Sequence, residues 1–197
     1  KNENTRLRNL LRAKPKTSEQ IQMAEVLALE LDPTSRKLTI NQGKNNGVFE
    51  GQAVIDAQGI IGQVMRVGLW TSTVMLITDP NHEIPVQVAR TRLQAVAIGT
   101  GVVNRLSLLY LPIAGIKAGI KVGDLLVTSG QGGHFPPGYP VGTVIEVSPD
   151  ISQPYVQVQV VPTALLERSR EVLLVWEDKT GQPVEKSVQK KKKKEQK

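Results

Sequence analysis

Hydrophobic and polar residues alternate along much of the chain, which is the period-two pattern of half-buried β-strands. The clearest examples are Leu27, Leu29 and Leu31, then Ile84, Val86 and Val88, then Val156, Val158 and Val160. Similar or more uniformly apolar runs cover 37–41, 52–56, 60–67, 72–78, 95–99, 106–111, 124–128, 143–147 and 172–176. Turn residues separate these short runs at the spacing of small barrels or sandwiches, so the pattern predicts a mainly β protein.

The first residues of the chain follow the helical period instead. Leu7, Leu10 and Leu11 form one apolar stripe at i, i+3 and i+4, and Pro15 ends the predicted helix. A helix this short is only marginally stable on its own. Two interpretations stay open, which are the end of a coiled coil and a helix packed against the body. In the first case the three leucines are the candidates for self-association.

Turn residues predict several local features inside the body. Residues 56–59 predict a short hairpin loop between two strand-like runs. Gly43, Gly47 and Gly51 recur four residues apart between strands, which favours turns with positive φ. Residues 163–168 are the one segment of the body that we expect to be helical, since a proline precedes them and a threonine can cap their start.

The positive charge of the chain is concentrated at its two ends. The 197 residues include 25 Lys+Arg and 18 Asp+Glu, for a net charge of +7. Residues 1–16 carry a net charge of +5 and residues 179–197 one of +6, so the body between them has a net charge of −4 and offers few aromatic residues for stacking. We therefore expect no nucleic-acid partner. Residues 178–197 predict a disordered, lysine-rich tail, either a solvated appendage or an electrostatic tether to anionic lipid or polymer.

Candidate chemistry is sparse. The chain has no cysteine, which excludes disulfides and thiolate chemistry. His82, Asp124 and Ser129 follow the chain order of trypsin-like proteases, but Asp124 and Ser129 lie too close on one strand and turn to act as separate members of a triad. We therefore expect no catalytic residue, cofactor or metal site, and hence no enzyme. A trypsin-like small-barrel hydrolase, active or degenerate, is the alternative.

Several longer motifs resemble one family. They are NQGKNNGVFEGQAV at 41–54, GIIGQV at 59–64, VGDLLVTSG at 122–130, GYPVG at 138–142 and SREVLLVW at 169–176. Together they resemble the MreC family of rod shape-determining proteins, of the Gram-negative type. The resemblance extends over 7–176, nearly the whole chain.

This resemblance implies an architecture. It implies two small β-barrel-like domains, at 17–100 and 101–177, which are either sequential or interleaved. The end of a coiled-coil helix at 1–16 precedes them. No stretch of the chain reaches the roughly 20 apolar residues of a membrane span. The resemblance therefore implies a periplasmic protein that is anchored in the inner membrane by a segment outside this chain.

The resemblance also implies a function and partners. Members of the family are non-catalytic scaffolds of the cell-wall elongation machinery, which self-associate as dimers or filaments. The implied partners are the elongation-specific penicillin-binding transpeptidase, which the scaffold would bind and activate, MreD and, through the complex, the actin-like MreB. A glycine- and proline-rich loop then becomes the candidate structural or partner-binding element. Its expected turn residues and apolar anchors are Gly130, Gly133, Phe135, Gly138, Tyr139 and Gly142.

Overall fold

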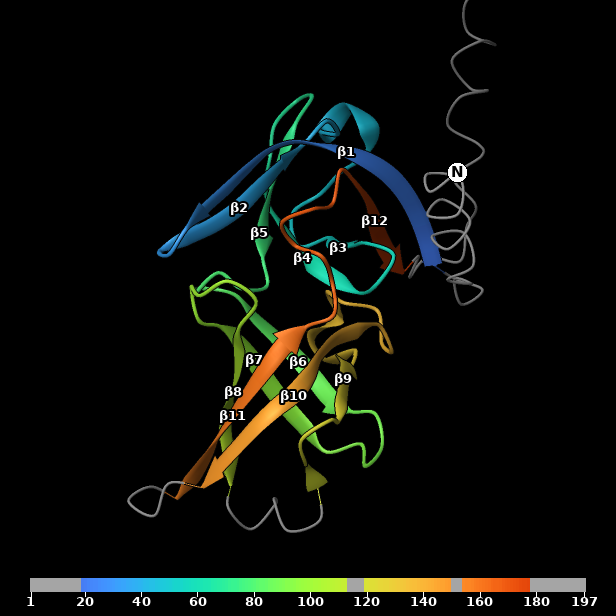
Figure 1. Cartoon of the computed structure of the whole chain (residues 1–197). Helices are drawn as coiled ribbons and strands as arrows, with labels where there is room; N and C mark the ends of the chain where they lie inside the picture. Colours follow the sequence, from blue (N-terminus) through green and yellow to red (C-terminus); the bar gives the residue numbers. More distant parts are fainter. Residues whose placement is uncertain (1–18, 113–118, 150–153, 178–197) are drawn as a thin grey trace, which may run out of the picture.

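Two closed antiparallel β-barrels, stacked end to end, form the part of the chain that the structure describes (Figure 1). The computed structural model describes residues 19–112, 119–149 and 154–177. The expected coiled-coil helix at 1–16, with Leu7, Leu10 and Leu11, and the expected lysine-rich tail at 178–197 lie outside these residues. The prediction of a mainly β protein with two small barrels is confirmed.

The first barrel combines both ends of the described chain. Its strands are β1 (Glu19–Asp32), β2 (Ser35–Ile40), β3 (Ala53–Ile55), β4 (Ile60–Val67), β5 (Ser72–Leu76) and β12 (Glu171–Glu177). They follow one another around the barrel in the order β1-β12-β3-β4-β5-β2. A short 3-10 helix, η1 (Lys44–Asn46), connects β2 to β3. β1 pairs with both β12 and β2, and its register shifts between Val26 and Ala28.

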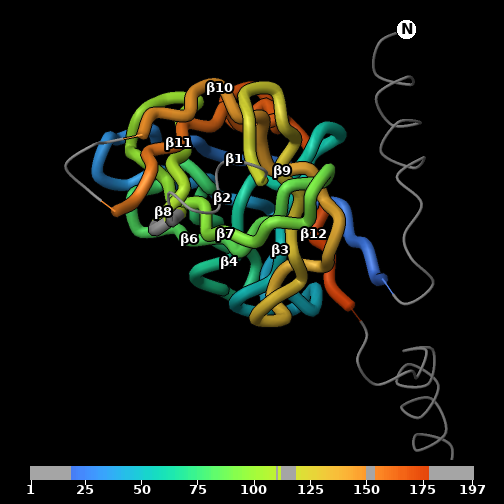
Figure 2. The backbone as a smooth tube through the Cα atoms, turned by 90° about the horizontal axis from the view of Figure 1, so that it is seen from below, coloured from blue at the N-terminus to red at the C-terminus, as the bar shows by residue number. Residues whose placement is uncertain are grey.

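The second barrel is inserted between β5 and β12. Its strands are β6 (Glu83–Val88), β7 (Gln94–Gly99), β8 (Leu106–Pro112), β9 (Leu125–Thr128), β10 (Pro140–Pro149) and β11 (Tyr155–Pro162). Their order around the barrel is β10-β11-β8-β7-β6-β9, and η2 (Gln131–Gly133) lies between β9 and β10. Figure 2 shows the blue start of β1 and the red end of β12 side by side on one flank, as their pairing requires.

The expected division at residue 100 needs correction. Residues 17–100 and 101–177 were expected as two β domains, but a boundary after residue 100 separates β7 from β8, which pair within the second barrel. The first barrel instead closes when β12 pairs with β1 and β3. The two barrels are therefore interleaved along the described chain, because β12 follows the second barrel in sequence but belongs to the first.

The alternation read from the sequence places aliphatic side chains inside the barrels. Leu38 and Ile40 point into the first barrel, and Ile84, Val86 and Val88 are buried in the second. Each such side chain contributes roughly 1.5–3 kcal/mol through burial. These aliphatic interiors hold the two barrels in shape and leave the loops between strands to form the contacts described below.

Two local predictions differ from the structure. Residues 163–168 form turns and not a helix, because the backbone N–H of Leu165 donates to Asp56 Oδ2 at 2.8 Å. Gly47 and Gly51 have positive φ as expected, whereas Gly43 is extended with φ −140. A side chain at Gly43 would lie 2.6 Å from backbone oxygens of the β4–β5 turn, so close approach explains this glycine. The hairpin loop at 56–59 is confirmed.

Candidate functional site: the joint between the barrels

The glycine- and proline-rich loop between β9 and β10 lies where the barrels meet. Gly130, Gly133 and Gly138 have φ of +81, +70 and +91, so the expected sharp turns are confirmed at these positions. Thr128 closes the loop, since its Oγ1 donates to the carbonyl of Pro136 at 2.5 Å and accepts the Tyr139 N–H at 2.9 Å. The loop is therefore held by its own hydrogen bonds and not only by the barrel ends.

Gly142 needs a different explanation from the one expected. It lies inside β10, opposite Pro162 of β11, and its φ is not positive. A side chain there would sit 2.5 Å from Val160 Cγ1 and 2.7 Å from the carbonyl oxygen of Val161. Glycine is required because two strands approach closely, and not because the chain turns.

Phe135 anchors the loop against His82, as an edge-on pair whose ring centroids are 5.9 Å apart. Both residues are buried, and His82 is only 3% exposed. Neither ring nitrogen of His82 has a hydrogen-bond partner among the described residues. Burial lowers the pKa of His82 to about 4, against a weaker opposing effect of the negative charge on Asp79. His82 is therefore neutral at pH 7.

Tyr139 links the loop to the first barrel. Its hydroxyl donates to Glu19 Oε2 of β1 at 2.7 Å, and both burial and this bond raise the pKa of Tyr139. The next residue also touches the first barrel, because a side chain at Gly59 would lie 2.4 Å from the Pro140 carbonyl oxygen. The loop thus packs directly on the β3–β4 hairpin.

Asp56 ties that hairpin to the chain returning from the second barrel. Its Oδ1 accepts the N–H groups of Gln58 and Gly59 at 2.7 and 2.9 Å. Its Oδ2 accepts the N–H of Leu165 at 2.8 Å and the hydroxyl of Ser169 at 3.1 Å. One buried carboxylate therefore fixes both a local turn and the return segment, residues 163–170.

Arg36 and Asp79 form a second buried polar contact between the barrels. Asp79 Oδ2 accepts the backbone N–H of Arg36 at 2.7 Å, and the Arg36 guanidinium donates through Nε to the Gly101 carbonyl at 2.9 Å. Glu167 of the return segment lies 4.0 Å from the same guanidinium. We call Arg36, Asp56, Asp79 and Tyr139 the joint, because each links structure from the two barrels or the chain between them.

The three protease-like residues are not assembled into a triad. Asp124 accepts two hydrogen bonds from the Arg90 guanidinium, both at 2.9 Å, and the Arg90 bond is the main reason that the pKa of Asp124 is lowered. Ser129 Oγ accepts the Gln131 N–H at 3.3 Å, and His82 has no polar partner in the described chain. This geometry contradicts the active form of the trypsin-like alternative.

Most of the joint could not be predicted from the sequence. Asp56 had a local signal, since an aspartate three residues before a glycine favours a turn, but nothing nearby in the sequence indicated its bonds to Leu165 and Ser169. Arg36 sits in an alternating strand and had no signal at all. Among the described residues no group of three or more His, Asp or Glu could hold a metal ion.

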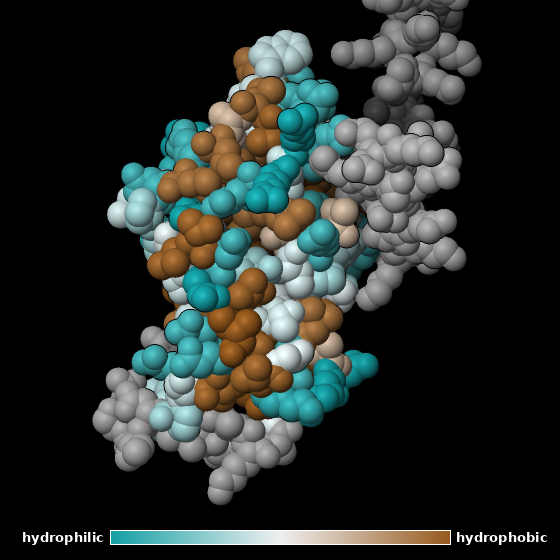
Figure 3. Space-filling model, in the orientation of Figure 1, coloured by the Kyte–Doolittle hydropathy of each residue, from teal (hydrophilic) through white to brown (hydrophobic). Residues whose placement is uncertain are grey.

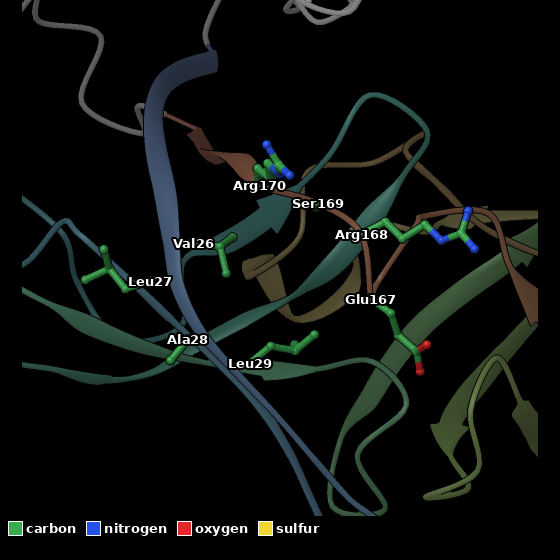
Figure 4. A pocket seen from close by; sticks show the side chains of 8 residues that line it. All are labelled: Val26, Leu27, Ala28, Leu29, Glu167, Arg168, Ser169 and Arg170. Carbon is green, nitrogen blue, oxygen red and sulfur yellow. The ribbon is translucent and has the colours of Figure 1, made fainter.

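A cavity of about 470 Å³ opens beside the joint, between β1 and the return segment (Figure 4). Its lining residues are Val26, Leu27, Ala28, Leu29, Glu167, Arg168, Ser169 and Arg170. Figure 3 shows apolar side chains gathered over the upper barrel and over the lower one. Among the described residues, the large hydrophobic side chains with high exposure include Leu27 and Leu29 on β1, and Leu69 and Trp70 at the β4–β5 turn.

The fold and the joint define an interleaved double β-barrel protein whose buried polar groups fix the two barrels relative to each other. The family model described as "Rod shape-determining protein MreC, barrel core" matches residues 26–176. The chain belongs to this family, MreC, as the sequence motifs indicated. No helix of the described part is long and apolar enough to cross a membrane.

Similar proteins carry the same family name. The chain is 49% identical over 174 residues to the cell shape-determining protein MreC of Haemophilus influenzae, covering 88% of the chain and 49% of that protein. It is 44% identical over 176 residues to the Escherichia coli K12 protein, covering 89% and 47%. The chain thus spans about half the length of these relatives.

Solved structures confirm the fold. One MreC structure matches with a TM-score of 0.80 and 46% identity over 89% of this chain and 98% of that one. MreC from Pseudomonas aeruginosa matches with a TM-score of 0.73 and 47% identity, over 79% and 98%. MreC in a complex with the penicillin-binding protein PBP2 of Helicobacter pylori matches with a TM-score of 0.62 at 18% identity, over 81% and 99%, which shows the fold alone.

Proposed function

We propose that this chain is the barrel part of a non-catalytic scaffold of the cell-wall elongation machinery. It would maintain rod shape by binding and activating the elongation-specific penicillin-binding transpeptidase. Family membership carries this proposal, since the relatives are cell shape-determining proteins. The Helicobacter pylori neighbour, which shares the fold, was solved in a complex with PBP2.

The joint suits such a role physically. A scaffold that acts by binding must present surfaces in a fixed relation, because disorder at an interface costs affinity when it is ordered on binding. Arg36 and Asp79 hold β2, the inter-barrel connection and the Gly101 turn together. Asp56 holds the return segment. These buried polar groups serve architecture, and the outer barrel surfaces stay available for partners.

The same proposal includes the location of the barrels, their self-association and further partners. The barrels would lie in the periplasm and be anchored in the inner membrane by a segment outside this chain. Leu7, Leu10 and Leu11 would contribute to self-association as a dimer or filament through a coiled coil. MreD and, through the complex, MreB would be further partners. Phe135 and Tyr139, with the glycines of their loop, support the joint. A partner would also contact this loop directly.

Binding to the transpeptidase tests the proposal. The purified chain of 197 residues is titrated calorimetrically into the periplasmic part of the elongation transpeptidase, and transpeptidation is followed with and without it. Saturable binding and faster crosslinking are expected. A matched periplasmic part of a division transpeptidase serves as the specificity control. No heat of binding at high micromolar concentrations, with crosslinking unchanged, would overturn the proposal.

A further inference from the structure

The turn between β4 and β5 carries the two most exposed large hydrophobic side chains of the described residues. Trp70 is 69% exposed and its neighbour Leu69 is 63% exposed. Neither side chain belongs to the hydrophobic core, so their burial contributes nothing to the stability of the barrel. Large apolar side chains that are exposed side by side mark a surface that contacts another molecule or a membrane.

Backbone hydrogen bonds hold this turn in place. The Gly68 N–H donates to the Thr71 carbonyl at 2.8 Å and closes the turn. The N–H groups of Lys44 and Asn45, in η1, donate to the carbonyls of Gly68 and Leu69 at 2.9 and 3.1 Å. The apolar side chains are therefore presented on a preorganised backbone, which lowers the entropic cost of binding.

The turn lies at the end of the first barrel that is remote from the joint. β4 begins at Ile60, beside the hairpin that packs on the second barrel, and it ends at Val67. Its length places the β4–β5 turn roughly 25 Å from that hairpin. Figure 1 shows this turn protruding at the outer end of the first barrel, with η1 beside it. We call residues 44–46 and 68–71 the tip.

The charged side chains closest to the tip in the chain are cations. Lys44 is exposed within η1, and Arg66 is exposed two residues before the turn. Neither forms an ion pair with another described residue. Both ammonium and guanidinium groups bind phosphate oxygens.

Two glutamates lie near the tip but do not belong to it. Glu25 of β1 accepts a hydrogen bond from Asn41 Nδ2 at 3.4 Å, before η1 begins. Glu50 lies beyond η1, and the N–H of the following Gly51 donates to the carbonyl of Val64, within β4 and before its end. Both carboxylates are thus set back from the β4–β5 turn, and the charges at the tip itself are positive.

This combination of side chains fits the surface of a lipid bilayer. Tryptophan favours the level of the lipid headgroups, leucine favours the boundary with the acyl chains, and lysine and arginine favour the phosphate groups. The core of a protein interface would need a broader apolar patch around such anchors. The other exposed side chains of the tip are instead polar, at Asn45, Asn46 and Thr71. A fluid bilayer accepts a wedge of two apolar side chains without such a patch.

We propose that the tip inserts Leu69 and Trp70 into the interfacial layer of a lipid bilayer, with Lys44 and Arg66 facing lipid phosphate groups. The proposal rests on the proposed function in taking the barrels to lie beside a membrane. It adds that the first barrel itself touches the bilayer, which would direct the second barrel away from it.

Tryptophan fluorescence tests the insertion, because the chain has two tryptophans. Trp176→Phe isolates the emission of Trp70, and the difference between the parent chain and Trp70→Phe gives the same signal should the first variant not fold. Vesicles of phosphatidylethanolamine and phosphatidylglycerol are titrated into the full chain at high salt, which screens the attraction of its charged ends. The emission of Trp70 should shift to the blue, and lipids brominated on their acyl chains should quench it.

Substitutions of the apolar pair give the matched comparison. Leu69→Ser together with Trp70→Ser should weaken vesicle binding at high salt by at least about tenfold, because both apolar side chains are lost. Val122→Ser, at a position of the second barrel that is 60% exposed, should leave binding unchanged.

The two cations are tested at low salt. Lys44→Gln together with Arg66→Gln should weaken vesicle binding by about fivefold. Arg92→Gln, at an exposed position in the β6–β7 turn of the second barrel, should have no such effect. Equal effects of these changes would remove the cations of the tip from the proposal and overturn it in this form.

Three further results would overturn the insertion. They are vesicle binding with unshifted Trp70 emission, which would assign lipid binding to the charged ends of the chain, no vesicle binding, and equal binding by the Leu69 and Trp70 double variant. Loss of transpeptidase binding by that variant in lipid-free buffer would make the tip a protein contact and also overturn it. If the parent chain inserts Trp70 but does not bind the transpeptidase, the insertion is supported and the scaffold function alone fails.

Discussion

His82 shows how one buried side chain makes the stability of the fold depend on pH. The ordinary pKa of histidine is 6.5, and burial lowers that of His82 to about 4. Between these values the unfolded chain binds a proton that the folded chain does not, so stability is complete above pH 6.5 and falls as the pH drops toward 4. The loss attributable to His82 should reach at most about 3 kcal/mol.

Urea unfolding of the chain between pH 4 and pH 7.5 measures this effect. The variant His82→Leu, which has no ionisable group at this position, should have a much flatter dependence of unfolding free energy on pH. His134→Ala, at an exposed position of the β9–β10 loop that Phe135 anchors against His82, should keep the parent slope. A His82→Leu variant with an unchanged slope would show that other groups determine the acid sensitivity.

Gly142 and Gly123 are glycines for two different reasons, which are steric crowding at Gly142 and a positive φ at Gly123. Gly142→Val should destabilise the chain by about 1 to 3 kcal/mol, because the new side chain meets Val160 and Val161 within the β10–β11 pair. Gly123→Ala is the comparison, since Gly123 has φ +91 and an added Cβ there meets nothing within 4 Å. That change should cost about 1 kcal/mol from strain alone. Thermal denaturation of both variants tests the distinction, and an unaffected Gly142→Val would contradict it.

At the scale of elements, hydrophobic periodicity predicted the strands whose pattern is set by residues close together in the sequence. The alternation of Ile84, Val86 and Val88 places one face of β6 in a core wherever the strand lies, so this strand was predicted. The prediction of a helix at 163–168 was wrong, because Asp56 accepts a hydrogen bond from the backbone N–H of Leu165, which is 109 residues away in the sequence. A local pattern contains no information on such a partner. The register shift of β1 between Val26 and Ala28 could not be predicted for the same reason.

Asp56 provides the element-scale prediction. Asp56→Ala removes the acceptor for three N–H groups and one hydroxyl, and should lower the free energy of unfolding by about 3 kcal/mol. Asp32→Ala is the matched control, because Asp32 accepts two bonds from Thr34 in an exposed turn and should matter much less. Hydrogen exchange should also quicken at Leu165 in the Asp56 variant alone. Equal effects of the two substitutions would contradict the role given to Asp56.

At the scale of the whole molecule, the sequence supported two barrels but left their order along the chain open. The same strands fit a sequential and an interleaved arrangement, and the difference lies in one pairing, β12 with β1 and β3. Leu173 pairs with Ile55 across more than a hundred residues, which no local signal reports. The joint could not be predicted for the same reason, because Arg36 and Asp79 are 43 residues apart in the sequence and come into contact only in the folded chain.

Arg36 tests whether the joint fixes the barrels as a unit. Arg36→Met removes the bond to the Gly101 carbonyl and the charge facing Glu167, while the backbone N–H still reaches Asp79. Amide exchange should quicken in 99–102 and 163–170, and the barrel strands should stay protected. Lys37→Met, the neighbouring residue on β2, is the control. Unchanged exchange in both segments would show that apolar packing alone holds the barrels together.

We propose that the full-length protein determines cell shape by holding other proteins in place. Its depletion in its own rod-shaped cell, followed by microscopy of cell width and length, is the decisive experiment. The rods are expected to widen and round up as the protein disappears. Cells that keep their width and shape through several divisions without the protein would contradict it.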